Sequence, residues 1–241
     1  MLIKAPNSLI KDLKKQKREN SSLLFLDNFK IIKDAISAGL KPKYILVSDE
    51  KYNVWDNQEV LKVDNQTIDQ LSDSKTPQGV VCITEYIQDV VSKPKTNFLV
   101  VDSLQDPGNV GTLIRTATAC GFNSIFLLDS VKITNSKLVR SSVGTIFQNK
   151  IFSMTKDEFC VKAKEWNLNL VMADMNGENI FNCNFNDIVG VVVGNEGQGV
   201  CEQIASICNY SVMIPMKNNV ESLNASISGA IIMYEIAKKS F

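Results

Sequence analysis

The stretch IPMKNNVESLNASISGAIIMYEIAKK, residues 214–239, decides the fold of the second half of the chain. Pro215 cannot donate a hydrogen bond to a sheet, so it marks the end of a strand. The residues 217–219, Lys-Asn-Asn, predict a turn because Asn tolerates a positive φ. From Leu223 onward the residues are apolar on nearly every side of a helix, which predicts a helix buried on all its faces.

Polar side chains crowd the predicted start of this C-terminal helix. Glu221, Ser222 and Asn224 lie where the first turn leaves free N–H groups, and polar side chains are useful there. A helix that is apolar along its length and polar around its start predicts a binding site at that start.

The remainder of the chain predicts two α/β units. A small unit spans residues 1–90, a linker carrying Lys93-Pro94-Lys95 covers 91–96, and a larger unit spans 97–241. In the larger unit strands alternate with helices, which predicts a mostly parallel sheet covered on both faces. Its predicted strands are 98–101, 124–128, 146–152, 168–174, 188–193 and 211–214, and its predicted helices are 110–120, 136–143, 156–166, 203–206 and the C-terminal one.

Composition excludes several classes of protein. The chain has 241 residues, of which 44% are hydrophobic, and it contains no apolar run of about 18 residues that could span a membrane. Its N-terminus has no apolar signal segment. The six cysteines form no CxxC pair, so we expect reduced thiols in a cytoplasmic protein. Histidine is absent, which excludes Ser-His-Asp and Cys-His catalysis, and no metal centre is expected.

Charge is balanced overall but uneven along the chain. Lysine and arginine total 26, as do aspartate and glutamate, so a uniformly basic nucleic-acid binder is not indicated. The first 20 residues nevertheless hold six cations against two acids. A solvated helix face over residues 7–20, with Ser8 as its N-cap, is the default interpretation, and a local phosphate-contacting patch is the alternative. The cations are Lys4, Lys11, Lys14, Lys15, Lys17 and Arg18.

Two further segments carry side chains suited to chemistry. Residues 102–115, DSLQDPGNVGTLIR, run from a strand into a Pro-Gly turn, and Asn109 is predicted to cap a helix that carries Arg115. By itself Arg115 reads as an ordinary surface arginine. Residues 191–199, VVVGNEGQG, lead an apolar strand into a glycine-rich loop with Glu196 at its centre, where a ligand can approach the backbone closely. The loop matches neither the Walker nor the GxGxxG pattern.

Taken together, NVGTLIRTATACGF, VVVGNEGQG and IPMKNNVESLNAS resemble, in order and spacing, the three motifs of the SpoU or TrmH family of RNA ribose methyltransferases within the SPOUT superfamily. The resemblance covers residues 97–241. LKPKYILVSDE and SDSKTPQGVVCITE resemble pieces of the smaller substrate-binding domain of the ribosomal-protein L30e type that accompanies such enzymes.

This resemblance implies an α/β fold with a deep trefoil knot at the C-terminus of a mostly parallel sheet, joined to a small L30e-like α/β domain that binds RNA. It implies a homodimer with its sites at the interface and S-adenosylmethionine as cofactor. The reaction is methyl transfer to a ribose 2′-hydroxyl, and ribosomal RNA is favoured over tRNA by analogy. No membrane partner is implied.

The family's roles carry over to matching positions of this chain. The catalytic set comprises Arg115 near the 2′-hydroxyl and its phosphate, Asn109 holding the loop, Glu196 supporting the site, and Ser222 and Asn224 positioning substrate and the methionine end of the cofactor. The cofactor-binding set is Gly194, Asn195, Ile214, Met216 and Leu223, largely through backbone.

Two departures and three rival functions accompany the resemblance. Asn218 stands where the family usually has glycine, and 26–29, Leu-Asp-Asn-Phe, replaces the usual Val-Glu-Gly of the smaller domain. The rivals are a tRNA 2′-O-methyltransferase, a non-catalytic RNA-binding or assembly factor on the same fold, and a methyltransferase for a substrate other than RNA. Asn109, Arg115, Glu196 and Asn224 together argue against the non-catalytic factor.

Overall fold

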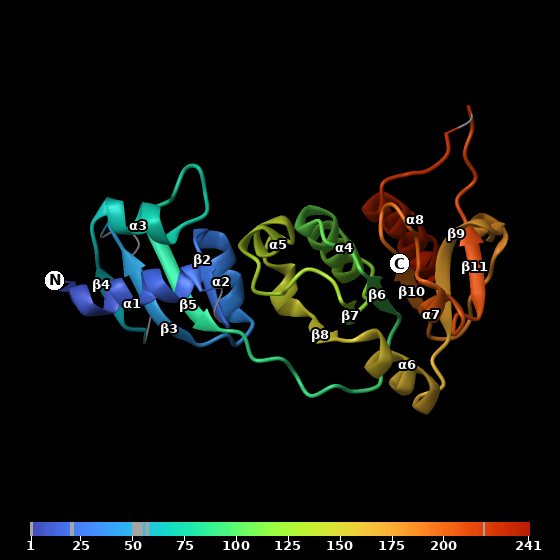
Figure 1. The fold of residues 1–241 in the computed structure, drawn as a ribbon, viewed down its shortest axis with the longest axis horizontal. Coiled ribbons are helices and arrows are strands. Elements are labelled where there is room, and N and C mark those ends of the chain that lie inside the picture. The colour runs from blue at the N-terminus through green and yellow to red at the C-terminus, as the bar shows by residue number, and fades with distance from the viewer. Residues whose placement is uncertain (1, 20–21, 50–54, 56–57, 219) are drawn as a thin grey trace. The chain divides into compact units, whose positions relative to one another are not determined.

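The computed structural model describes residues 2–19, 22–49, 55, 58–218 and 220–241. The chain divides into two compact units, one of residues 1–87 with 134–147 and the other of residues 88–133 with 148–241, and Figure 1 shows the elements of each. Within the described residues, no helix has the length and apolar character needed to cross a membrane. The predicted limits of the two domains, 1–90 and 97–241 with a linker over 91–96, stay predictions.

The N-terminal unit is built on a mixed sheet. Its described residues form five strands in the order β1-β4-β3-β5-β2, with β1, β4 and β3 parallel and β5 antiparallel to both β3 and β2. The elements are β1 (Ile3–Lys4), α1 (Asn7–Arg18), β2 (Leu23–Leu26), α2 (Phe29–Ser37), β3 (Pro42–Val47), β4 (Val60–Lys62), α3 (Asn65–Leu71), β5 (Val80–Glu85) and α5 (Ser136–Ser141).

One buried carboxylate organises the loops of this unit. Asp27 follows β2 directly, and its side chain is only 4% exposed. Its Oδ2 accepts hydrogen bonds from Ser72 Oγ at 2.7 Å, Asp73 N at 2.9 Å and Ser74 N at 3.1 Å, and Arg140 on the α5 segment lies 3.4 Å away. A buried charge needs such partners, so this aspartate in the 26–29 segment fixes the turn after α3.

The C-terminal unit contains a parallel sheet, as predicted. Its described residues form six strands in the order β11-β9-β10-β6-β7-β8, and every neighbouring pair is parallel. The elements are β6 (Phe98–Asp102), α4 (Pro107–Ala119), β7 (Ser124–Leu128), β8 (Lys150–Met154), α6 (Lys156–Glu165), β9 (Leu170–Asn179), β10 (Gly190–Val193), α7 (Glu202–Ala205), β11 (Tyr210–Met213) and α8 (Ala225–Ala237), with the 3-10 turns η3 (Ile180–Asn182) and η4 (Lys238–Ser240). The 3-10 turn η2 (Thr145–Gln148) lies where the chain passes from the N-terminal unit into this one.

Side chains alternate across this sheet, so each face has its own helical layer. One face packs Phe98, Phe126 and Phe152 against Phe159 of α6 and Ile204 of α7. On the other face α8 approaches closely: a Cβ at Gly229 would lie 2.4 Å from Leu113 of α4 and 2.9 Å from Val193 of β10. Glycine therefore lets α8 lie against both α4 and the end of β10 (Figure 1).

The carboxyl end of β6 holds the loop that follows β10. Asp102, with a side chain 1% exposed, accepts hydrogen bonds from Cys201 N at 2.7 Å and Ser103 Oγ at 2.9 Å, and Lys156 Nζ lies 3.4 Å away. Burial alone would raise the pKa of Asp102, but these hydrogen bonds and the lysine charge outweigh it and hold that pKa below its ordinary value of 3.8.

Several predicted helix starts are wrong. Pro6, not Ser8, is the N-cap of α1, in an extended conformation with no side-chain cap. Asp106, not Asn109, caps α4, because Pro107 occupies the first helical turn.

The strand predicted over 146–152 is replaced by η2 and by β8, which starts at Lys150. Asn20, the predicted end of the first helix, lies outside the described residues.

The C-terminal helix also differs from its prediction. It starts at Ala225 with Asn224 as its N-cap, so Leu223 belongs to the preceding loop. It is not buried on every face: Ile227 and Tyr234 are each 49% exposed in the single chain. The apolar sequence allowed burial, but α4 and the sheet cover only one side. The predicted positive φ is confirmed at Asn218, which has φ 59°, while Asn219 lies outside the described residues.

We expect Asp102→Asn to destabilise the fold by about 1–3 kcal/mol near neutral pH, because the substitution removes the charge that Cys201 N and Lys156 engage. A carboxyl whose pKa is lowered by folding stabilises the folded state above its unfolded pKa, and this contribution is lost as the pH falls through the folded pKa. The difference between variant and parent should therefore shrink below the ordinary pKa of 3.8.

Urea unfolding from neutral pH to about pH 3 measures this difference. Asp187→Asn is the matched control, because Asp187 is exposed and should give no comparable loss. An Asp102→Asn deficit that stays constant over the whole pH range would contradict a role for the charge.

Candidate active site

A cavity of about 740 Å³ opens at the carboxyl ends of β10 and β11. Its volume lies within the range of about 300–1,000 Å³ typical of small-ligand sites, and the crevice beyond the carboxyl ends of parallel strands is where such sites form. Four stretches contribute most of the lining, namely 172–175 in β9, 193–200 from the end of β10 onward, 212–216 from the end of β11 onward, and 220–223 in the loop before α8.

Backbone contact shapes the loop after β10. A Cβ at Gly194 would lie 2.2 Å from both the carbonyl carbon of Gly199 and the nitrogen of Val200, so only glycine fits there. Asn195 and Gly199 exchange two backbone hydrogen bonds, of 3.0 and 2.9 Å, and Gly199 has a φ of +71°. The two glycines therefore let the loop close on itself. They are required by backbone contacts inside the loop, and not simply by the approach of a ligand as the sequence predicted.

Asn195 uses its side chain inside this loop. Its Oδ1 accepts from Gly197 N at 2.9 Å, and its Nδ2 donates to the Ser103 carbonyl at 3.2 Å. Together with the bond from Cys201 N to Asp102, this fixes both ends of the loop to the last residue of β6 and to Ser103, which follows it. Asn195 lines the cavity, but its side chain supports the wall.

The three sequence motifs meet in one chain of hydrogen bonds. Asn109 Nδ2, in the first turns of α4, donates to Glu196 Oε1 at 2.8 Å across 87 residues. Asn224 Nδ2 donates to Asn109 Oδ1 at 3.0 Å across 115 residues. Asn224 Oδ1 in turn accepts from Ser226 N at 2.9 Å and caps α8. The structure thus brings together three of the predicted catalytic residues.

The remaining predicted residues lie in two places. Ser222 and the predicted cofactor-binding residues all line the cavity; these are Gly194, Asn195, Ile214, Met216 and Leu223. Met216 and Leu223 are 37% and 36% exposed, so they offer an apolar surface to a ligand. Arg115 is not among the lining residues. It is exposed on α4, on a different side from Asn109 and about 9 Å farther along the helix axis.

Sequence reasoning missed Asp102 and Lys156. The available signal was the single aspartate that ends the apolar strand FLVVD, followed by a loop. A carboxylate at the end of a buried strand must be paired, but its partners, Lys156 and the nitrogen of Cys201, come from distant segments that no local pattern predicts.

Three of the cysteines are poorly suited to act as nucleophiles. All six are free thiols, as expected. Burial raises the pKa of Cys82 and of Cys208 to about 12 and that of Cys120 to about 11. Thiols with such pKa values stay protonated at neutral pH and are unreactive. In the part of the chain that the structure describes, no group of three or more cysteine or acidic side chains could hold a metal ion.

Two family models match this chain. Residues 96–234 match the SpoU rRNA Methylase family, and residues 4–82 match the MRM3-like substrate binding domain.

A curated relative and two solved structures are similar over nearly the whole chain. The 23S rRNA (guanosine(2553)-2'-O)-methyltransferase RlmP of Bacillus subtilis is 25% identical, over 96% of this chain and 97% of that protein. An AdoMet-bound rRNA methyltransferase from Sinorhizobium meliloti superposes with a TM-score of 0.85 at 23% identity, covering 100% of this chain and 98% of the other.

The second structure is the SpoU methyltransferase AviRb of Streptomyces viridochromogenes in complex with AdoMet, with a TM-score of 0.84 at 22% identity and 98% coverage of both chains. These two likenesses establish the shared fold. Because the first family model spans more than half of the sequence and includes all three hydrogen-bonded motifs, the chain belongs to the SpoU rRNA methylase family.

Proposed function

We propose that this chain transfers a methyl group from S-adenosylmethionine to a ribose 2′-hydroxyl of ribosomal RNA. The observation that carries the proposal is the hydrogen-bonded chain Glu196–Asn109–Asn224, which ties the three motifs together at the mouth of a ligand-sized cavity. Methylation of RNA follows from the family. The similarity to a 23S rRNA methyltransferase over almost the full length of both proteins supports ribosomal RNA over tRNA.

The cavity suits such a donor. S-adenosylmethionine supplies an electrophilic methyl group on a positively charged sulfonium. The loop after β10, with Gly194 and Asn195, would form one wall, and Ile214, Met216 and Leu223 would hold the opposite side through backbone groups and apolar surface. Asp102 and Lys156 keep the first wall in place, although neither lines the cavity.

Positioning is the main task left to the protein, because alignment for in-line attack accounts for much of the acceleration of such a transfer. The guanidinium of Arg115 offers five N–H donors in a planar fork, so it suits holding a phosphate and polarising the 2′-hydroxyl. Ser222 at the cavity and the Asn224–Asn109 pair beside it would orient the ribose. No histidine is required for these roles.

The position of Arg115 favours a homodimer. Arg115 is exposed on α4 and does not line the cavity of its own chain. The exposed apolar side chains of Leu223, Ile227 and Tyr234 lie on or just before α8, which packs beside α4. A second copy covering this surface would bury it and would place Arg115 at an interface next to the sites.

The trefoil knot of the family is part of the same proposal. The chain leaves β11 at the edge of the sheet and returns in α8 to β10 and α4, nearer its centre. That return supports a threaded C-terminal segment. Cytoplasmic location likewise stays a prediction.

We expect Arg115→Ala to lower methyl transfer at least a hundredfold, roughly the cost of removing one group that stabilises developing charge. S-adenosylmethionine binding, measured by titration calorimetry, should change little, since Arg115 does not line the cavity. Arg115→Lys should be intermediate because it keeps the charge but loses the planar fork. Equal loss of transfer and donor binding would instead show that Arg115 has a structural role.

A paired substitution tests the hydrogen-bonded chain. Asn109→Asp places a carboxylate against Glu196, where 2.8 Å now separates Nδ2 from Oε1, and we expect about a tenfold loss of donor affinity as the loop is displaced. Adding Glu196→Gln restores a donor and an acceptor with their roles exchanged, while Asn224 can still donate to residue 109.

The double variant should therefore bind the donor as the parent does. If the double variant binds the donor no better than Asn109→Asp alone, the hydrogen bonds between Glu196, Asn109 and Asn224 do not shape the cavity. Transfer activity separates the two possible roles of Glu196, because rescue of binding without rescue of transfer would mean that its carboxylate also acts on the substrate.

A further inference from the structure

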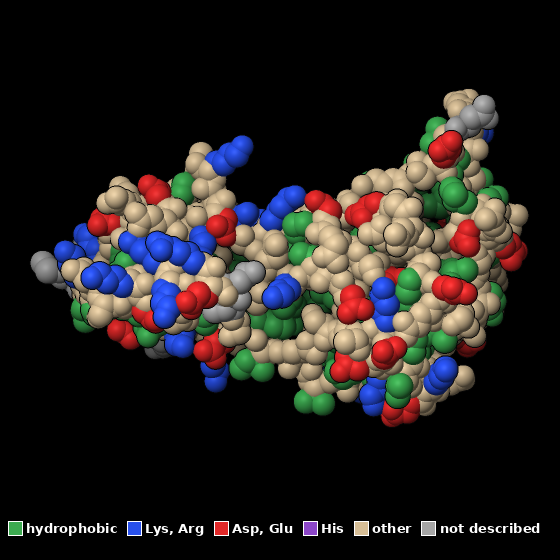
Figure 2. Space-filling view, viewed as in Figure 1, with side chains coloured by type: hydrophobic (Ala, Val, Ile, Leu, Met, Phe, Trp, Pro, Cys, Tyr) green, Lys and Arg blue, Asp and Glu red, His purple; other side chains and the backbone are tan. Residues whose placement is uncertain are grey.

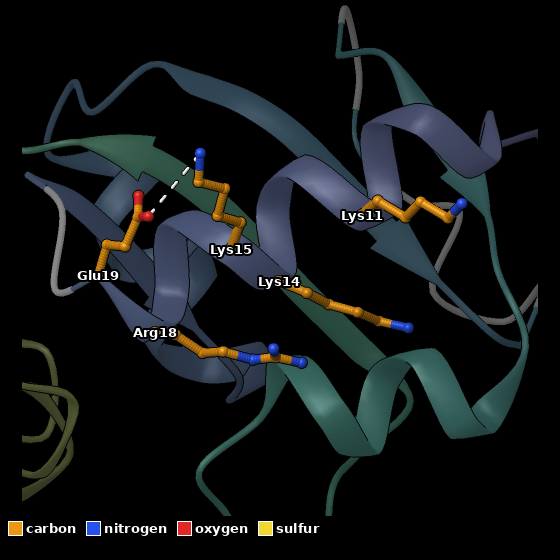
Figure 3. A pocket seen from close by; sticks show the side chains of 5 residues that line it. All are labelled: Lys11, Lys14, Lys15, Arg18 and Glu19. Atoms are coloured by element: carbon orange, nitrogen blue, oxygen red, sulfur yellow. Dashed lines mark ion pairs between the residues drawn. The ribbon is translucent and has the colours of Figure 1, made fainter.

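The first helix carries a compact group of cations on its outer surface. Lys11, Lys14, Lys15 and Arg18, with Glu19, line a surface depression of about 390 Å³, and these residues constitute the α1 cationic face. Lys11, Lys14 and Arg18 share one side of the helix and reach past it in the same direction, whereas Lys15 points toward Glu19 (Figure 3). In Figure 2, Lys and Arg side chains gather over this part of the N-terminal unit.

Little negative charge offsets this face. Within the part of the chain that the structure describes, Glu19 pairs with Lys15 alone, at 3.8 Å, and both side chains are more than half exposed, so the pair contributes little. Among the described residues, neither Lys11 nor Arg18 makes an ion pair. The pKa of the nearby Asp64 is lowered first by its hydrogen bonds with Thr67, whose N–H it caps at 2.7 Å, and more weakly by the charges of Lys14 and Lys4.

The opposite side of α1 is fixed to the unit. Ile10 and Leu13 are buried in its core. Lys17, by contrast with the α1 cationic face, is engaged internally: its Nζ donates to the Leu71 carbonyl at 2.6 Å and pairs with Asp73 at 3.0 Å. The outer cations therefore stand on a helix that is already held in place, so a ligand would have only their side chains to order.

We infer that the α1 cationic face binds backbone phosphates of the substrate RNA and holds it to the N-terminal unit without reading its bases. This inference rests on the proposed function. From Lys11 to Arg18 the helix rises about 10 Å, enough to meet more than one phosphate of a strand. Long cationic side chains on an exposed surface suit a polyanion, because contacts to phosphate are strong and independent of sequence.

The chemistry favours RNA over a small anion. A site for a single phosphate gathers backbone N–H groups, as at a helix N-terminus, but these cations occupy the middle and last turns of α1, where backbone N–H groups are already bonded within the helix. The match of residues 4–82 to a substrate-binding domain supports the same assignment.

The test uses the full chain with Lys11→Gln, Lys14→Gln and Arg18→Gln combined, because Gln keeps helix propensity. The probe is a transcribed fragment of Bacillus subtilis 23S rRNA that contains guanosine 2553, measured by filter binding over a range of salt. Loss of three phosphate contacts should weaken binding roughly a hundredfold near 0.1 M salt and lower the salt slope by about 2–3. In transfer assays, KM for RNA should rise while kcat at saturating RNA holds.

Matched variants control for net charge and for folding. Lys93→Gln, Lys95→Gln and Lys164→Gln remove the same charge from exposed positions of the other unit and should leave affinity and salt slope nearly unchanged. Lys11→Arg with Lys14→Arg should bind as the parent does. Donor binding by calorimetry and the thermal melting curve should be unchanged in all three variants.

Each contrary result has a distinct meaning. Unchanged RNA affinity and salt slope in the Gln variant, with transfer intact in the parent, would overturn the inference and leave the proposed function standing. Absence of transfer by the parent to this and to total RNA would overturn the proposed function. Competition by polyglutamate as effective as that by RNA would also overturn the inference, because it would mark a docking face for acidic proteins.

Discussion

The buried carboxylate of Asp102 is the interaction on which the candidate site depends. It accepts the N–H of Cys201 at the point where the glycine loop returns, and Lys156 makes its charge tolerable. At the other end of the loop, Gly194 has no side chain, so the backbone of Gly199 and Val200 can occupy the space that a Cβ at position 194 would need. Glu196 is carried between these two fixed points, which is why it can meet Asn109 on another element. The orientation of Glu196 at the site therefore depends on Asp102, at the end of β6.

The sequence predicted those elements whose pattern is local. Strand 124–128 has the predicted bounds because five consecutive apolar or small residues lie between a turn and an aspartate. The parallel sheet followed from strands alternating with helices, and Asn218 was identified because Asn tolerates the positive φ that the turn requires. In each of these cases the deciding pattern is visible in consecutive residues or in the order of successive elements.

Elements were misplaced where two local signals competed or where burial depended on a neighbour. Asp106 and Asn109 are both good N-caps, and only the position of Pro107 separates them. For α8, composition predicted burial all round, but an apolar sequence cannot state what covers it. Resemblance alone assigned Glu196, Asn109 and Asn224 to one site, and the hydrogen bonds between them were not predicted, since the three residues come from widely separated motifs. Arg115 shows most clearly what local sequence patterns cannot predict. Family resemblance assigned it to the catalytic site, but it does not line the cavity of its own chain.

A formal net charge of zero is compatible with binding a polyanion when the charges are segregated. Affinity from counterion release depends on the cations that touch phosphate and not on the total charge of the protein. Acidic side chains on another face would weaken RNA contacts that use that face. A strongly basic protein would bind any RNA through many surfaces and would dissociate slowly from RNAs that are not its substrate. In a neutral protein, cations gathered on the face of a helix would favour the orientations that use this face, so selectivity would arise from where the charges lie.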